Sequence, residues 1–180
     1  MSNFTNQKLV LDHELVDFEL FFVNLEGRKG GFNTDGKRSF RLKFNDEEFA
    51  KALVEDGWNV KIFTPKNTNY EPYYGMDVKT KFKSDSESVR YNPEIHYINR
   101  KNDILCDASN IHIVDNAFDA RKVIAVDLVV NPYHWGPNER GEGITAYIDA
   151  MYVYVEDSPF GDRSASVFGL PEDNDEELPF

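Results

Sequence analysis

The sequence predicts a mainly β fold: a partly closed antiparallel barrel with one short helix and a disordered, acidic C-terminal tail. Several segments rich in β-branched and aromatic residues alternate apolar and polar positions, as half-buried strands do. A single segment has helical spacing, and residues 157–180 have no periodicity. With 180 residues, the chain is long enough for about one domain with its own core.

Six segments have the character of strands, because each is bounded by Gly, Pro, Asn or Asp. In chain order they are Leu15 to Val23, Ser39 to Phe44, Trp58 to Thr64, Met76 to Phe82, Lys122 to Val130 and Ile144 to Val155. Shorter hairpin-like pieces are expected around Ile95 to Ile98 and Ile111 to Val114. Five or six strands with long connections favour a small, partly closed barrel over a sandwich of regular hairpins.

One helix is expected from Asp46 to Glu55. Asn45 can cap its first turn, where three acidic residues favour the positive end of the helix dipole. Gly57 ends it, as glycine often does just after a helix. The side expected to be buried consists of Phe49, Leu53 and Val54.

The composition changes at Asp157, so the chain is expected to divide into a domain, residues 1–157, and a tail, residues 158–180. Ser, Gly, Ala, Asp and Glu dominate the tail, and its first part reads equally well as a frayed terminus. Its last ten residues, PEDNDEELPF, read as a solvated acidic run closed by an apolar, proline-stiffened tip.

The composition also excludes several classes of protein. Hydrophobic residues make up 41% of the chain, too many for a disordered protein. Cys106, the single cysteine, cannot form an intramolecular disulfide or a cysteine-based zinc site, which predicts a reducing compartment. The N-terminal stretch MSNFTNQKLVLDHE lacks the layout of a signal peptide, and no apolar run reaches membrane-spanning length. A cytoplasmic protein with no membrane partner is therefore expected.

The net charge of −12 at first argues against a nucleic-acid partner. The charges are unevenly distributed, however: residues 28–101 carry 15 Lys and Arg against 11 Asp and Glu, and the acidic surplus lies outside this window. Between Arg28 and Lys43 there are six cations against Asp35 alone. The chain thus combines one basic zone with one acidic tail.

Strand alternation gathers part of this basic zone on one face. In the segment Ser39 to Phe44, apolar residues point one way while Arg41 and Lys43 point the other. If the middle strands are neighbours, one sheet face presents Arg41, Lys43, Lys61, Phe63, Lys79, Lys81 and Lys83. Such a face suits a polyanion, although solvated lysines on an exposed or edge strand would show the same pattern.

Aromatic residues lie in expected loops beside these cations, where they could stack on unpaired bases or cap the barrel ends. Phe32 lies in a Gly-rich loop, Tyr70, Tyr73 and Tyr74 in a second loop, and Tyr133 and Trp135 in a third. The candidates for nucleic-acid contacts are Arg28, Lys29, Phe32, Lys37, Arg38, Arg41, Lys43, Lys61, Phe63, Tyr70, Tyr73, Tyr74, Lys79, Lys81, Lys83 and Trp135.

The sequence offers little for catalysis. The four histidines are scattered without metal-ligand spacing, and no phosphate-binding loop, dinucleotide fingerprint or nucleophile elbow is present. The triplet Asp77-Val78-Lys79 is similar to the D/E-x-K of magnesium nucleases, but three residues recur easily by chance. No enzyme, metal or cofactor is expected.

The C-terminal residues resemble the acidic tip of bacterial and phage single-stranded DNA-binding proteins, in which an acidic run precedes an aliphatic residue, Pro and Phe. Here the matching residues, with Leu178 where isoleucine is usual, are Asp173, Asp175, Glu176, Glu177, Leu178, Pro179 and Phe180. More weakly, Arg38 to Phe44 followed by a short helix, and Gly143 to Ala150, look like phage members of that family with an OB-fold.

This resemblance implies an OB-fold-like barrel that coats single-stranded DNA (ssDNA) without catalysis, in phage-type replication, recombination and repair. It also implies recruitment of partner proteins through the acidic tip, and the host cytoplasm as location if a phage encodes the chain. The chain lacks the long Gly/Gln/Pro-rich linker of the bacterial proteins, which leaves strand order and homo-oligomerisation open. The alternatives are an acidic interaction or DNA-mimic protein and, less favoured, a metal-dependent nuclease.

Overall fold

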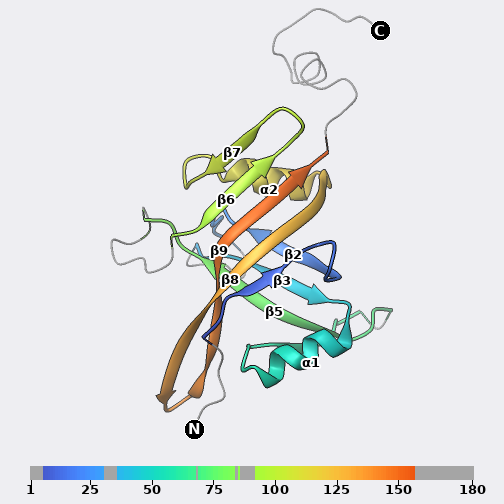
Figure 1. The fold of residues 1–180 in the computed structure, drawn as a ribbon, viewed down its shortest axis with the longest axis vertical. Coiled ribbons are helices and arrows are strands. Elements are labelled where there is room, and N and C mark those ends of the chain that lie inside the picture. Colours follow the sequence, from blue (N-terminus) through green and yellow to red (C-terminus); the bar gives the residue numbers. More distant parts are fainter. Residues whose placement is uncertain (1–5, 31–35, 68, 84, 86–91, 157–180) are drawn as a thin grey trace, which may run out of the picture.

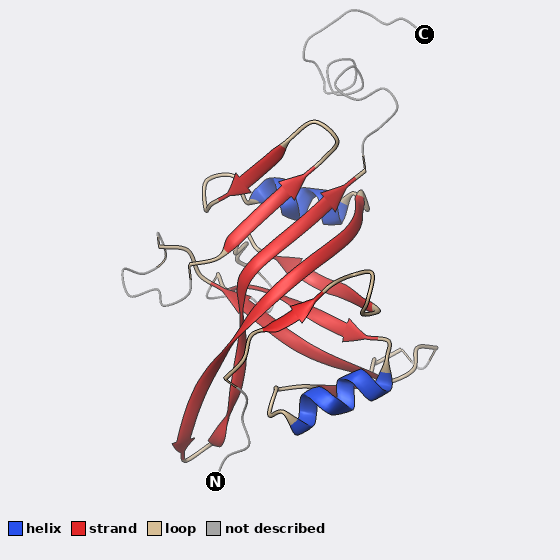
Figure 2. Cartoon of the chain, viewed as in Figure 1, coloured by secondary structure: helices blue, strands red, loops and turns tan. Residues whose placement is uncertain are grey.

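The computed structural model describes residues 6–30, 36–67, 69–83, 85 and 92–156. These residues form nine strands and two helices (Figure 2). In chain order the elements are β1 (Leu9–Leu11), β2 (Phe18–Asn24), β3 (Arg38–Phe44), α1 (Glu47–Glu55), β4 (Lys61–Phe63), β5 (Tyr73–Thr80), β6 (Glu94–Ile98), β7 (Asp103–Cys106), α2 (His112–Asp119), β8 (Val123–Asn138) and β9 (Gly141–Val155).

The strands form one strongly curled sheet in the order β1-β8-β9-β5-β3-β2 (Figure 1). β4 pairs with β5, while β6 and β7 form a hairpin attached to β9. Most pairs are antiparallel, but β9 runs parallel to both β5 and β6. The expected mainly β, OB-fold-like and partly closed barrel is therefore confirmed.

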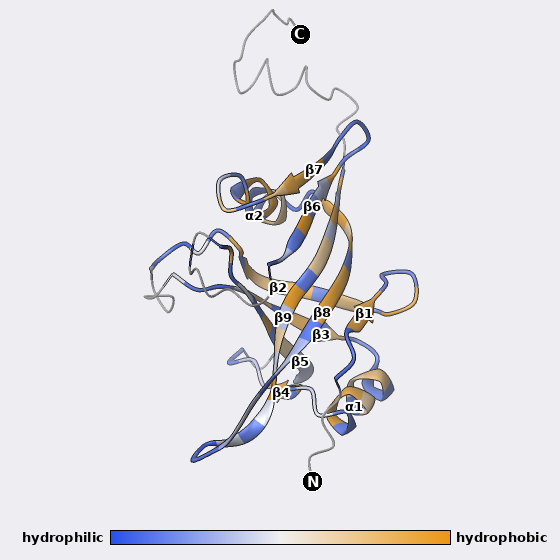
Figure 3. Ribbon diagram, turned by 60° about the vertical axis from the view of Figure 1, so that its left-hand side comes forward, coloured by the Kyte–Doolittle hydropathy of each residue, from blue (hydrophilic) through white to orange (hydrophobic). Residues whose placement is uncertain are grey.

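Strand alternation decides which side of the sheet faces the core. Phe40, Leu42 and Phe44 of β3 are buried, and they lie beside Met76 and Val78 of β5. The hydrophobic residues gather along the barrel strands, whereas the far end of the β8–β9 hairpin is hydrophilic (Figure 3). Because one face of β3 and β5 is buried, their other side chains are displayed together outside.

Helix α1 confirms the predicted helix with two corrections. Asp46, not Asn45, is the N-cap, and its Oδ1 accepts a hydrogen bond from the Phe49 backbone N–H at 3.2 Å. Ala50 and Leu53 form the buried side, while Val54 is 47% exposed and does not belong to it. Gly57 follows the helix at φ +93°, a conformation that glycine adopts without strain.

The strand piece expected at Ile111 to Val114 is wrong, because helix α2 covers most of it. Ile111, Val114 and Ala117 are buried at helical spacing, which outweighs the local β-branched character. Asp115 is fully buried in α2 and accepts hydrogen bonds from the backbone N–H groups of Leu25 and Glu26, at 2.9 and 2.8 Å. This contact anchors the end of β2 to α2.

Several element boundaries also differ from the prediction. Tyr73 and Tyr74 belong to β5, and Tyr133 and Trp135 belong to β8, instead of lying in loops. β5 ends at Thr80, so Lys81 and Lys83 follow the strand and are not placed by its alternation. β1 and β7 were not predicted, since three or four residues carry too little periodicity to be recognised.

Candidate nucleic-acid interface

A groove of about 1750 Å³ crosses the outer face of the sheet at β2, β3, β4 and β5. Half of the predicted contact residues line it: Lys37, Arg41, Lys43, Phe63, Tyr70, Tyr73, Tyr74 and Lys79. Its lining also includes Phe21, Phe22 and Lys66, which the sequence analysis did not single out. Its described lining holds five cationic side chains and three carboxylates, so the groove is basic although the chain is acidic.

The register of the strands explains why these side chains meet. Arg41 of β3 lies opposite Phe21 of β2 on one side and Asp77 of β5 on the other. Lys43, two residues further along β3, lies opposite Glu19 and Gly75. Residues paired across an antiparallel ladder project from the same face, so cations, acids and rings share one surface.

Arg41 is held by an acid and by aromatic rings at once. Its Nε lies 2.8 Å from Oδ1 of Asp77, and its Nη2 lies 3.5 Å from Oδ2. The hydrogen bond with Asp77 is the main reason that the pKa of Arg41 is raised. The guanidinium carbon lies 3.8 Å from the ring centroid of Phe63 and 5.4 Å from that of Phe22, within cation–π distance.

The rings form a connected group around this cation. Phe63 and Tyr73 are stacked, with centroids 5.6 Å apart and ring planes 26° apart. Tyr73 also meets Phe21 edge to face at 6.1 Å. The Nζ atom of Lys43 lies 5.8 and 5.9 Å from the centroids of Tyr73 and Phe21, and 3.7 Å from Glu19.

Phe22 is one of the groove residues that sequence reasoning missed. Strict alternation after Leu20 would turn it toward the core, yet its side chain is 73% exposed. Its φ is +56°, and the pairing of β2 with β3 shifts register just after Phe21. A bulge of this kind re-aims a side chain, and two consecutive aromatic residues in an alternating strand are the sequence signal for it.

Other predicted residues lie away from the groove. Arg38 binds Asp85 and the Leu25 carbonyl oxygen, and the Nη1 of Arg28 lies 3.3 Å from Asp119. Lys29, Lys61, Lys81 and Lys83 are exposed but do not line it. The predicted residues outside the described part of the chain are Phe32, Asp173, Asp175, Glu176, Glu177, Leu178, Pro179 and Phe180.

Trp135 lies on the β8–β9 hairpin, beyond the groove. It faces Gly143 across the hairpin, where an added Cβ would come within 3.0 Å of the indole ring. Tyr133 and Tyr147 meet edge to face at 5.9 Å, and Tyr147 pairs in register with Lys79. These aromatic residues therefore extend the grooved face of β5 along the hairpin.

A comparison with protein-family models matches residues 3–178 to the family described as "Putative phage ssDNA-binding domain". The chain belongs to this family. The resemblance inferred from the sequence to phage single-stranded DNA-binding proteins is thereby confirmed.

Solved structures give weaker likenesses to this phage ssDNA-binding domain. The single-stranded DNA-binding protein from bacteriophage Enc34 in complex with ssDNA is 16% identical, with a TM-score of 0.48 over 86% of this chain and 89% of that chain. Its C-terminal truncation is 14% identical, with a TM-score of 0.47 over 85% and 88%. The single-stranded DNA binding protein gp2.5 of bacteriophage T7 is 8% identical, with a TM-score of 0.34 over 97% of this chain and 100% of that chain. A comparison with curated proteins finds no match.

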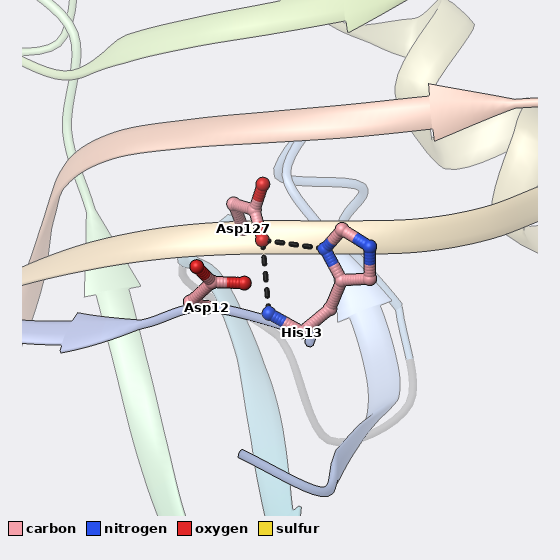
Figure 4. A group of neighbouring side chains, drawn as sticks. All are labelled: Asp12, His13 and Asp127. Carbon is pink, nitrogen blue, oxygen red and sulfur yellow. Dashed lines mark hydrogen bonds and ion pairs between the residues drawn. The ribbon is translucent and has the colours of Figure 1, made fainter. Parts of the chain in front are cut away.

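One further cluster of the phage ssDNA-binding domain consists of Asp12, His13 and Asp127 (Figure 4). The Nδ1 of His13 lies 2.6 Å from Oδ1 of Asp127, which also accepts the His13 backbone N–H at 2.9 Å. Tyr154 donates its hydroxyl to the other oxygen of Asp127 at 3.1 Å. These bonds fasten the turn after β1 to β8, which gives the cluster a structural role.

Within the described residues, no helix is long and apolar enough to cross a membrane.

Proposed function

We propose that this phage ssDNA-binding domain coats single-stranded DNA without catalysis and with little preference for base sequence. The observation that carries the proposal is the groove, where cations and aromatic rings from β2, β3, β4 and β5 share one sheet face. Unpaired strands are bound by this combination, because cations follow the phosphates while rings stack on bases of any kind.

The proposed strand path begins among Tyr70 and Lys66, passes Phe63 and Phe22, and leaves at Lys79 toward the hairpin. Stacking contributes roughly 1–3 kcal/mol per base, and each neutralised phosphate adds about 0.7 to the salt slope on single strands. Trp135 and Tyr133 are proposed to contact longer strands that continue past β5. We assign Arg38 a structural role instead of a DNA contact, since its guanidinium already binds the carboxylate of Asp85.

The acidic segment at residues 158–180 is proposed to recruit proteins of replication and recombination in the host cytoplasm. Asp173, Asp175, Glu176 and Glu177 would speed encounter with a basic partner surface. Leu178, Pro179 and Phe180 would supply an apolar anchor that Pro179 partly preorganises. The support for this part is the resemblance of these residues to the acidic tip of the family.

A fluorescence titration with an oligo-dT strand at two salt concentrations, with and without magnesium, tests the proposal. We expect saturable binding that weakens steeply with salt and leaves the DNA intact. Absence of binding at low salt would favour the acidic-interaction alternative. Magnesium-dependent loss of labelled strand would instead favour a nuclease.

A further inference from the structure

The middle of the groove carries an exposed carboxylate where a phosphate would be expected to bind. Asp77 has 47% of its side chain exposed, whereas its partner Arg41 has 26%. A phosphate approaching Arg41 would meet this carboxylate first and be repelled by it. The two hydrogen bonds with Asp77 also occupy the Nε–Nη2 edge of the guanidinium, one of the two edges with which arginine can grip phosphate.

The faces of the same guanidinium lie among rings. Arg41 lies over Phe63, and Phe63 continues the stack to Tyr73. The ring centroid of Phe22, which is mostly exposed, lies 5.4 Å from the guanidinium carbon. Arginine stacks on aromatic rings and on bases. With its charge neutralised by Asp77, the planar guanidinium of Arg41 can therefore serve as a stacking surface, as the rings do.

Two other cations of the groove could follow the phosphates. Lys66 and Lys79 both line the groove, and both are exposed. Neither forms an ion pair with the residues that the structure describes. Lysine is a flexible point charge, suited to tracking a backbone without fixing its geometry.

We propose that Asp77 turns Arg41 from a phosphate contact into part of an electrically neutral base-stacking platform with Phe63 and Phe22. The platform draws the bases of the strand inward, while Lys66 and Lys79 hold its phosphates at the rim. This inference rests on the proposed function and assigns the groove two chemically distinct subsites.

The test compares an oligo-dT strand with an abasic strand of equal length, over a range of salt concentrations. R41K keeps the charge of Arg41 but removes the plane, so it should weaken dT binding about tenfold and leave abasic binding and the salt slope unchanged. D77N frees the guanidinium for phosphate, so it should strengthen abasic binding and steepen the slope by about 0.7.

K79Q is the matched control, because Lys79 shares the face of Asp77 without an acidic partner among the described residues. It should lower the slope by about 0.7 on both strands, which shows that one lost phosphate contact is detectable. An unchanged slope in D77N, or equal weakening of both strands by R41K, would overturn the platform. If R41K failed to fold, D77N alone would decide. A wild-type chain that bound neither strand would refute the proposed function itself.

Discussion

The ring of Phe63 lies against Gly75, at a position where a Cβ on Gly75 would come within 2.9 Å of the ring. The absence of a side chain on β5 at this point lets the ring cross from β4 toward Arg41 and stack on Tyr73. Gly75 is buried and does not itself line the groove, so it shapes the aromatic part of the groove through the ring of Phe63.

Replacing Gly75 by Ala should weaken ssDNA binding several-fold, because the new methyl group displaces the Phe63 ring. It should also lower the free energy of unfolding, since the added Cβ would lie 2.8 Å from the Leu42 carbonyl oxygen. Titrations of Gly75→Ala, Phe63→Ala and the double variant check the effect on binding. If the two binding losses simply add, Gly75 does not act through Phe63.

Phe22 should lower the stability of the fold while contributing to ssDNA binding. Its left-handed backbone costs a bulky residue roughly 1–3 kcal/mol, while its exposed ring gains little from packing. Both Phe22→Gly and Phe22→Ala should weaken ssDNA binding alike, yet Phe22→Gly should be the more stable of the two. Thermal denaturation alongside titration measures both effects. Wild-type affinity in both variants would remove Phe22 from the DNA path.

The pair of Arg38 and Asp85 should make stability depend on acid pH. Hydrogen bonds from Arg38, at 2.9 and 3.1 Å, are the main reason that the pKa of Asp85 is lowered. A lowered folded-state pKa stabilises the fold above the unfolded value near 3.8 and loses that contribution as pH falls through the folded value. As the pH is lowered from 5, the free energy of unfolding measured with urea should therefore fall more for wild type than for Asp85→Asn. Parallel pH profiles would contradict this.

The hydrogen bond between His13 and Asp127 should make stability fall as the pH rises, which is the opposite of the dependence expected from Asp85. It is the main reason that the pKa of His13 is raised above 6.5. A raised folded-state pKa gives stability that is fully present below pH 6.5 and is lost as pH rises through the folded value. Wild type should lose stability from pH 6.5 upward relative to His13→Gln. Tyr154→Phe, which keeps His13, serves as a control that should retain this dependence.

Deleting residues 171–180 should raise ssDNA affinity, most clearly at low ionic strength, because we propose that the acidic run competes with DNA for the basic groove. Deleting only Leu178 to Phe180 should leave DNA affinity nearly unchanged while abolishing recruitment of partner proteins. Titration and pull-down with each truncated chain measure the two effects. Lower DNA affinity after removal of the acidic run would show that these residues do not compete.

The sequence predicted the grooved face best where one side of a strand is buried. Phe40 and Leu42 had to turn inward, so Arg41 and Lys43 had to turn outward. It could not predict that Asp77 would face Arg41, because that contact depends on the register between β3 and β5. The bulge at Phe22 is likewise a property of the pairing of two strands. Helix α2 was missed because its buried side faces β2, far away in the sequence.

Strand β5 pairs with β3, β4 and β9, and β9 comes from the far end of the domain. This strand carries Tyr73, Asp77 and Lys79 of the groove. Its pairings are complete only after distant parts of the chain have come together. Contacts of long sequence separation form slowly, so recovery of ssDNA binding after dilution from denaturant should lag behind recovery of helix α1. Binding activity would then report the last step of folding, and a nascent chain lacking β9 would present DNA with an unfinished groove.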